Sequence, residues 1–166
     1  MSLRPAWRRR ATAWAIAVAV VAGTAGHAVA DPSPNDKDAG DLDPDHAAGK
    51  VAVERKEWPE AIERLGRAAL RDPDNADLQN SLGYAYRKLG QLEPAFRHYK
   101  RALELNPRHR GAHEYIGEAY LMAGDLASAE RHLEALLTIC LLPCEELADL
   151  EREVAAYRAK RGAGVR

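Results

Sequence analysis

Two cysteines four residues apart have the most readily predicted chemistry in the chain. Cys140 and Cys144 lie on either side of Pro143, a residue that interrupts helices. In an oxidising compartment an even pair is first interpreted as a disulfide, here one that closes a short loop and stabilises by about 2 kcal/mol. The alternatives are a redox or metal role, although the two-residue spacing of thioredoxin-like sites is absent.

Histidines are the next candidates, because their imidazole nitrogens can bind zinc. His109 and His113 are four residues apart, but zinc requires three or four converging ligands, and Arg108 and Arg110 oppose a cation beside His109. No nucleophile–base pair, phosphate loop or haem-attachment motif stands out. The sequence therefore predicts a protein that is not an enzyme and that has no metal and no cofactor.

The first thirty residues have the three parts of a secretory signal. Arginines at positions 4 and 8–10 precede an apolar run over 11–25, and Ala28-Val29-Ala30 forms a small-x-small cleavage site. We expect residues 1–30 to be a signal peptide cleaved after Ala30, which sends the chain to the periplasm. The alternative is an uncleaved membrane anchor, for which the run is shorter than the roughly 20 residues that a spanning helix needs.

Residues 31–44 are rich in Asp and Pro and almost free of apolar side chains, which predicts a flexible acidic leader. Removal of residues 1–30 takes away four arginines and no acidic residue, so the net charge changes from −1 to −5. That balance argues against a nucleic-acid partner, which normally requires a basic face. No membrane association is expected after cleavage.

Columns of small residues repeat every 34 positions through the rest of the chain. The glycine column is Gly49, Gly83 and Gly117, and an alanine column contains Ala61, Ala95 and Ala129. A period of this length indicates a stack of helical hairpins, each of which buries its apolar faces only against its neighbours. The predicted fold is thus all-α.

The predicted array occupies residues 45–141, in three units at about 42–75, 76–109 and 110–143. Helices are expected to begin at Pro59 and Pro94, because proline is accepted in the first turn of a helix. Apolar residues at helical spacing over 144–161 predict a capping helix with a polar outer face, followed by a disordered tail at 162–166.

This pattern resembles the tetratricopeptide repeat family. The resemblance rests on Leu82-Gly83-x-x-Tyr86, Gly90-x-Leu92, Ala95-x-x-x-Tyr99-x-x-Ala102 and Pro107, which are echoed 34 residues to either side. The first unit departs from the pattern, since Ala52 replaces the usual aromatic residue and Lys56 the usual glycine.

The resemblance implies a right-handed superhelix that binds a peptide or protein segment in a concave groove lined by the first helices of the hairpins. The residues left facing the groove in the second and third units are Asn80, Tyr84, Arg87, Lys88, Glu114, Glu118, Leu121 and Met122. The alternative is that these are ordinary solvated residues, with the C-terminal helix covering the last two. The Lys/Asn/Arg set with which some members grip a C-terminal carboxylate is not found here.

The sequence thus predicts a non-catalytic, periplasmic protein-interaction module that binds a partner peptide or protein segment. A self-associating scaffold that forms homo-oligomers is the alternative. A redox or metal protein built on Cys140 and Cys144 is a further alternative.

Overall fold

The computed structural model describes residues 43–163, and within this range it contains seven α-helices and no strand. The signal peptide and nearly all of the acidic leader predicted above lie outside the described residues. The helices are α2 (Pro44–Glu54), α3 (Trp58–Arg71), α4 (Ala76–Lys88), α5 (Leu92–Leu105), α6 (Arg110–Met122), α7 (Leu126–Ile139) and α8 (Glu145–Ala163). The expected all-α class is confirmed.

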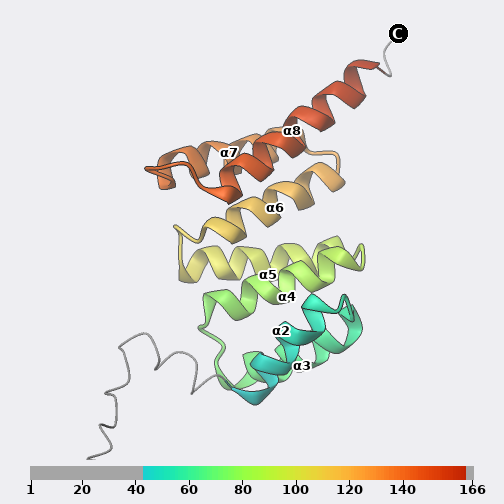
Figure 1. Cartoon of the computed structure of the whole chain (residues 1–166), viewed down its shortest axis with the longest axis vertical. Coiled ribbons are helices and arrows are strands. Elements are labelled where there is room, and N and C mark those ends of the chain that lie inside the picture. Colours follow the sequence, from blue (N-terminus) through green and yellow to red (C-terminus); the bar gives the residue numbers. More distant parts are fainter. Residues whose placement is uncertain (1–42, 164–166) are drawn as a thin grey trace, which may run out of the picture.

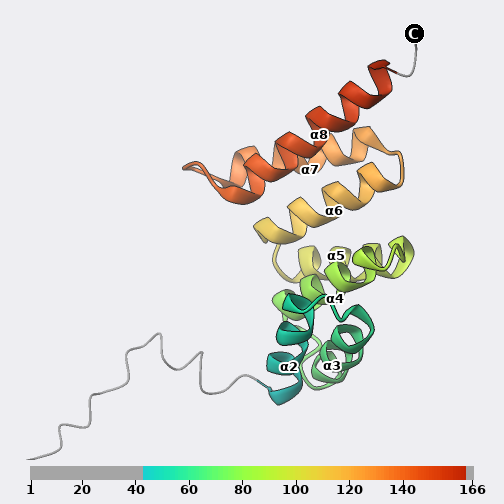
Figure 2. The same cartoon turned by 45° about the vertical axis from the view of Figure 1, so that its right-hand side comes forward.

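The helices form three hairpins, α2–α3, α4–α5 and α6–α7, that stack along the long axis of the molecule, with α8 at the far end (Figures 1 and 2). The first helix of each hairpin contacts the first helix of the next. Among the described residues no second helix contacts another second helix. The stack therefore curves toward the first helices, and we call the side formed by α2, α4 and α6 the inner face.

The small-residue columns explain how tightly each hairpin closes. The three alanines of the column at positions 61, 95 and 129 are fully buried. A Cβ added to Gly49 would lie 2.6 Å from Leu65 Cγ, and one added to Gly83 would lie 2.6 Å from Tyr99 Cδ1. Because carbon atoms normally approach to about 3.5–4.0 Å, only glycine fits at these two crossings.

The third glycine of the column has a different partner. The repeat places Leu133 where Leu65 and Tyr99 stand, but a Cβ on Gly117 would instead meet Leu150 Cδ2 of α8 at 2.7 Å. Leu150 is fully buried and belongs to the apolar cluster that joins α6, α7 and α8, together with Leu121, Ala129, Leu136 and Val154. Helix α8 is therefore packed into the array as tightly as the hairpins are closed.

Several predicted boundaries are wrong by one or two residues, and helix α3, for example, begins at Trp58 rather than at Pro59. Helix α2 begins at Pro44, inside the predicted leader, because Asp43 Oδ1 accepts hydrogen bonds from the backbone N–H of Asp45 (2.9 Å) and of His46 (3.2 Å). Such a side-chain cap stabilises a helix start by about 1 kcal/mol.

Helix α5 begins at Leu92 rather than at Pro94, which occupies its first turn, where a backbone N–H has no helical partner to lose. At the other end of the chain, α8 runs to Ala163 and so includes Gly162 and Ala163 of the predicted tail.

The turns that close the three hairpins share one geometry. Gly90 and Gly124 have φ of 74° and 83°, in the left-handed region, and the equivalent residue of the first hairpin is Lys56, with φ 60°. The backbone hydrogen bonds of the three turns also match. The N–H of the next residue donates to the carbonyl oxygen five residues before it, in the pairs Glu57–Ala52 (2.9 Å), Gln91–Tyr86 (3.0 Å) and Asp125–Tyr120 (2.9 Å). Lys56 therefore adopts a conformation that costs about 1–2 kcal/mol for a residue with a Cβ.

Cys140 ends α7 and Cys144 precedes α8, and a disulfide joins them. The bond holds together the two ends of the loop that contains Pro143. Among residues 43–163, no helix is sufficiently long and apolar to cross a bilayer.

Candidate functional site

Three aromatic rings, one from each hairpin, form a row: Tyr84 of α4 and Tyr115 of α6 belong to the inner face, and Trp58 is the first residue of α3. Trp58 and Tyr84 lie with ring centroids 5.8 Å apart at a steep angle, and Tyr84 and Tyr115 lie 4.9 Å apart. Edge-to-face and offset pairs at such distances are favourable arrangements of aromatic rings. We call these three residues the aromatic row.

Each residue of the aromatic row is half-buried, so part of its surface faces solvent. A hollow of about 270 Å³ opens beside the row and is lined by Val53, Asn80, Ser81, Tyr84 and Tyr115. Half-exposed rings beside a hollow are the type of surface that binds apolar or planar groups. Asn80 and Tyr84, two of the predicted groove residues, therefore line this hollow together.

Two cations of α4 contact the aromatic row. Lys88 is exposed, with its Nζ 5.9 Å from the ring centre of Trp58 and 5.7 Å from that of Tyr84. The guanidinium carbon of Arg87 is 5.3 Å from both tyrosine centres. These are cation–π distances, and they place the Lys88 ammonium at the exposed edge of the row.

Arg87, by contrast, was wrongly placed among the residues left over from packing. It is only 7% exposed, its Nε donates to Tyr99 Oη (3.2 Å), and its guanidinium pairs with Glu118. Burial opposes its charge, yet Tyr99 and Glu118 outweigh this effect and raise the pKa of Arg87. The charge is neutralised within the fold, so the middle of the groove is less basic than the sequence indicated.

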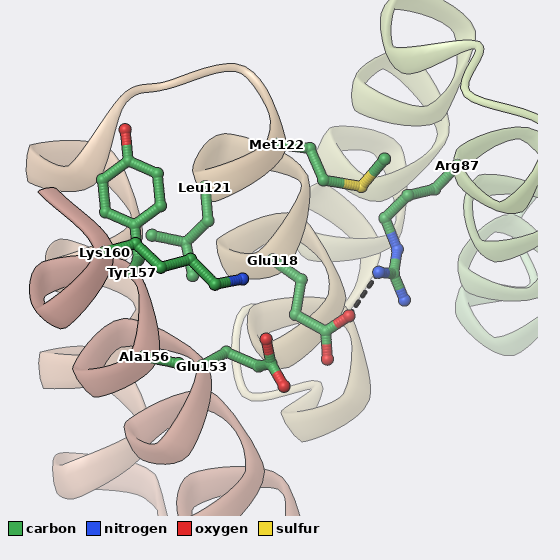
Figure 3. Close-up of a pocket in the computed structure, with 8 residues that line it drawn as sticks. All are labelled: Arg87, Glu118, Leu121, Met122, Glu153, Ala156, Tyr157 and Lys160. Atoms are coloured by element: carbon green, nitrogen blue, oxygen red, sulfur yellow. Dashed lines mark hydrogen bonds and ion pairs between the residues drawn. The ribbon is translucent and has the colours of Figure 1, made fainter. Parts of the chain in front are cut away.

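Beyond the ion pair, a second hollow of about 310 Å³ separates α6 from α8 (Figure 3). We call it the distal pocket. Its walls are Arg87, Glu118, Leu121 and Met122 on one side and Glu153, Ala156, Tyr157 and Lys160 on the other. Helix α8 covers Leu121, as the alternative interpretation anticipated, whereas Met122 remains 54% exposed.

A third hollow, of about 260 Å³, is dominated by carboxylates, and we call it the acidic pocket. It is lined by Asn80, Gly111, Glu114, Tyr115, Glu145, Glu146 and Asp149, from α4, α6 and α8. Glu114 is 7% exposed, and no hydrogen bond or ion pair joins its carboxylate to another of the described residues. Burial, followed by the nearby charges of Glu118, Asp149 and Glu146, raises the pKa of Glu114 to about 8.

The groups at the rim of the acidic pocket are better compensated. Arg110 Nε is 3.6 Å from Glu146 Oε1, and Arg152 Nη2 is 2.7 Å from Asp149 Oδ1. Burial, and then the proximity of Glu114, raises the pKa of Tyr115 to about 12. The interior of the pocket is therefore acidic and polar, with an aromatic wall.

Four histidines, His98, His109, His113 and His132, form polar contacts with other residues of the fold. His113 Nδ1 lies 3.0 Å from His132 Nδ1, and His113 Nε2 lies 3.0 Å from the carbonyl oxygen of Pro107. His98 contacts Gln79, and His109 caps α6 and contacts Asp77. In the described part of the chain, no three His, Cys, Asp or Glu side chains are arranged to hold a metal ion.

Sequence reasoning missed Trp58 and Tyr115 as site residues, and it missed the α8 residues that line the distal pocket and the acidic pocket. Tyr115 occupies the repeat position that Ala47 and Ser81 occupy in the first two units. A large aromatic residue at a position of small residues was the signal that could have identified it. The residues of α8 lie outside the 34-residue period, and no column relates them to the groove.

Comparisons with known proteins agree with this architecture. The family model of the tetratricopeptide repeat matches residues 76–109, and a further model described as TPR repeat matches residues 49–90. The chain is 29% identical over 106 residues to the TPR repeat-containing thioredoxin TTL4 of Arabidopsis thaliana. It is 34% identical over 112 residues to the uncharacterized protein ycf37 of Pyropia yezoensis.

The chain is much shorter than the first of these relatives. The match to TTL4 covers 63% of this chain but 15% of that protein, and the match to ycf37 covers 60% of this chain and 62% of that protein. Among solved structures, the first TPR of Spaghetti (RPAP3), bound to the HSP90 peptide SRMEEVD, superposes with a TM-score of 0.61 at 22% identity. That similarity covers 68% of this chain and 89% of the other, and it shows a shared fold.

Proposed function

Because this chain belongs to the tetratricopeptide repeat family, we propose that it is a non-catalytic interaction module that binds an extended segment of a partner protein along its inner face. The aromatic row carries this proposal. Trp58, Tyr84 and Tyr115 come from successive hairpins and keep part of their surfaces exposed, and the two tyrosines line a hollow of about 270 Å³. Partly exposed aromatic side chains in a concave surface are the usual anchors of a protein interface.

The similar fold of the first TPR of Spaghetti holds a peptide, which supports peptide binding as the mode of interaction. The chemistry of that peptide does not carry over. Its sequence, SRMEEVD, ends in acidic residues, whereas the inner face here presents Glu114 and Glu118 and three further carboxylates of α8. A segment with apolar or basic side chains fits this surface better than an acidic one, because like charges repel at an interface.

Site-specific photo-crosslinking tests the proposal in the native compartment. A photoreactive phenylalanine analogue replaces Tyr84 in one variant and Leu70 in a control variant. Leu70 lies on α3 and is 84% exposed. We expect a discrete crosslinked partner from position 84 and none from position 70, with the partner identified by mass spectrometry. Equal crosslinking from both positions would reject the inner face as the binding surface.

A pair of substitutions at one residue then tests the role of the ring. We expect Tyr84→Phe to retain partner capture and Tyr84→Ser to lose it, because the ring surface, rather than the hydroxyl, forms the row. Circular dichroism checks that both variants keep the helical content of the parent. Full capture by Tyr84→Ser would contradict the proposal.

Self-association is the second candidate, and one observation favours it. Leu137, Leu141 and Leu142 are 56%, 89% and 80% exposed around the disulfide loop. Apolar side chains gathered in this way often mark an interface. If a second copy covers them, light scattering detects a dimer that the double variant Leu141→Ser/Leu142→Ser abolishes; a concentration-independent monomer would reject this candidate.

We also propose that the module acts after export to the periplasm. The support is the basic, apolar and small-x-small order of residues 1–30, together with a disulfide, a bond that persists in oxidising compartments. Mass spectrometry of the protein recovered from its native source tests this proposal. The expected N-terminus is Asp31, and retention of residues 1–30 would contradict cleavage.

A further inference from the structure

The acidic pocket contains a buried carboxylate that the fold does not compensate. Glu114 is 7% exposed and lines the pocket, yet its carboxylate forms no hydrogen bond or ion pair with another residue in the range 43–163. Natural proteins rarely bury an acidic side chain without a partner, because its charged form loses hydration and gains nothing in return. A missing partner that brings positive charge would remove this cost.

Two more features of the pocket lack a compensating group. Asn80 Oδ1 is buried, and among the described residues it has no hydrogen-bond partner. Glu145, at the start of α8, is exposed and forms no ion pair within the described residues, whereas Glu146 and Asp149 pair with arginines at the rim. Glu114 of α6 is thus a buried, unpaired carboxylate that lines the hollow, and the exposed carboxylate of Glu145 adds negative charge from α8.

We propose that the acidic pocket binds the guanidinium group of an arginine side chain carried by the partner segment. This inference rests on the function proposed above, because it places that arginine beside the aromatic row. A guanidinium presents five N–H donors in a planar fork, which suits acceptors arranged on several sides. The hollow of about 260 Å³ is several times the volume of a water molecule, about 30 Å³, and admits such a planar group.

Tyr115 favours arginine over lysine as the occupant. It lines both the acidic pocket and the hollow beside the aromatic row, so a segment that lies on the row reaches the pocket directly. A guanidinium stacks on an aromatic face in a way that a hydrated ammonium does not. The cation is an organic one, since no three of the described His, Cys, Asp or Glu side chains are placed to hold a metal ion.

The raised pKa of Glu114 agrees with this occupant. Burial and the neighbouring carboxylates Glu118, Asp149 and Glu146 raise it to about 8, while Arg87 on α4 acts in the opposite direction. Arg110 and Arg152 lie at the rim beside Glu146 and Asp149. A guanidinium in the pocket would restore Glu114 to its charged form at neutral pH.

A titration with small amides tests the pocket itself. The ¹⁵N-labelled chain is titrated with Nα-acetyl-arginine methylamide, with the neutral isostere Nα-acetyl-citrulline methylamide, and with the lysine equivalent. We expect the arginine amide to shift the backbone signals of Gly111, Glu114 and the first turns of α8, and to bind at least about tenfold more tightly than the citrulline amide. Equal shifts from arginine and citrulline would overturn the proposal.

Conservative variants locate the binding. Glu114→Gln/Glu145→Gln is expected to weaken arginine binding by at least about tenfold, and the matched control Glu134→Gln, at an exposed position of α7, is expected to leave it unchanged. Because glutamine keeps the shape of both side chains and removes a buried carboxyl whose charged form the fold does not compensate, the first variant is expected to fold. Arginine binding that survives in Glu114→Gln/Glu145→Gln would place the site elsewhere and overturn the inference.

Selection from a random peptide library separates the two proposals. Peptides that bind the parent chain but not the Tyr84→Ser variant are expected to contain an arginine. Replacement of that arginine by citrulline is expected to weaken binding. If they bind the row but contain no such arginine, the acidic pocket is rejected and the interaction function remains. If no peptide depends on Tyr84, the proposed function itself is overturned, and this inference with it.

Discussion

Gly117 of α6 and Leu150 of α8 are in such close contact that a single added carbon on the glycine would lie 2.7 Å from Leu150 Cδ2. Leu150 is fully buried in the cluster that joins α6, α7 and α8. The contact determines where α8 lies, and so it also determines the walls of the distal pocket and of the acidic pocket.

Leu150→Ala is therefore expected to lower the free energy of unfolding by about 2–5 kcal/mol, the usual cost of emptying a buried leucine site. Urea denaturation followed by circular dichroism measures the loss. Leu70→Ala, at an exposed position of α3, is the matched control and should change stability by less than about 0.5 kcal/mol. A small effect of Leu150→Ala would mean that α8 is only loosely attached.

Two helical glycines, one inside the 34-residue column and one outside it, make a second prediction, because the same substitution has opposite effects at the two positions. Gly83→Ala places a Cβ 2.6 Å from the ring of buried Tyr99 and is expected to destabilise by about 1–3 kcal/mol. Gly66→Ala, inside α3, meets no atom within 4 Å and is expected to stabilise by about 0.5–1 kcal/mol, because alanine favours the helix. Thermal unfolding of both variants gives the two signs, and equal signs would contradict the packing argument.

These glycines also show why the fold was predictable from the sequence. The 34-residue spacing places Gly49, Gly83 and Gly117 at helix contacts where a Cβ does not fit, so the period reports a physical contact. The groove was less predictable. Arg87 has the spacing of a surface residue, but Glu118, which covers it, lies 31 residues later on the next hairpin. Spacing along one helix carries no information about such a partner.

The acidic pocket was beyond sequence reasoning for a related reason. Glu145, Glu146 and Asp149 look like the solvated face of a charged helix, and the fold brings them to Glu114 only because α8 packs on Gly117. Since α8 follows no repeat, its position depends on side-chain packing, which the period does not describe.

The turn after α2 predicts a stabilising substitution. Lys56 has φ 60° where the equivalent residues of the other two hairpins, Gly90 and Gly124, are glycines. Lys56→Gly is expected to raise the free energy of unfolding by up to about 1 kcal/mol, because glycine adopts positive φ without strain but also increases the entropy of the unfolded chain. Urea denaturation measures the gain. Lys56→Ala is the control, since it keeps the strain and should bring no such gain.

The disulfide predicts a loss of stability without a loss of binding. Cys140 and Cys144 close a loop with a sequence separation of 4, so the bond stabilises by about 2 kcal/mol through the unfolded chain. Cys140→Ser/Cys144→Ser is therefore expected to lower the unfolding midpoint and to retain partner capture in the crosslinking assay. Capture that fails in this variant while the helices remain folded would favour a redox role for the pair.

Glu114 predicts how stability depends on pH. Its pKa is raised from 4.5 to about 8, first by burial and then by Glu118, Asp149 and Glu146. Below pH 4.5 the carboxyl is protonated in both the folded and the unfolded chain. As the pH rises from 4.5 to about 8, the unfolded chain releases the proton first, so the folded state loses stability, by at most about 1.4 kcal/mol per pH unit. Above pH 8 the loss is complete.

Glu114→Gln removes this titration, so its stability relative to the parent should increase between pH 5 and 8 and then remain constant. The comparison is made as a difference at each pH, because burial lowers the pKa of His132 to about 4 and weakens the fold in both proteins as the pH falls from 6.5 toward 4. Urea denaturation at pH 5, 6, 7, 8 and 9 measures the difference, with Glu134→Gln as the control that should show none. A difference that is independent of pH would show that the carboxyl of Glu114 is charged throughout, which requires a compensating group already inside the folded chain.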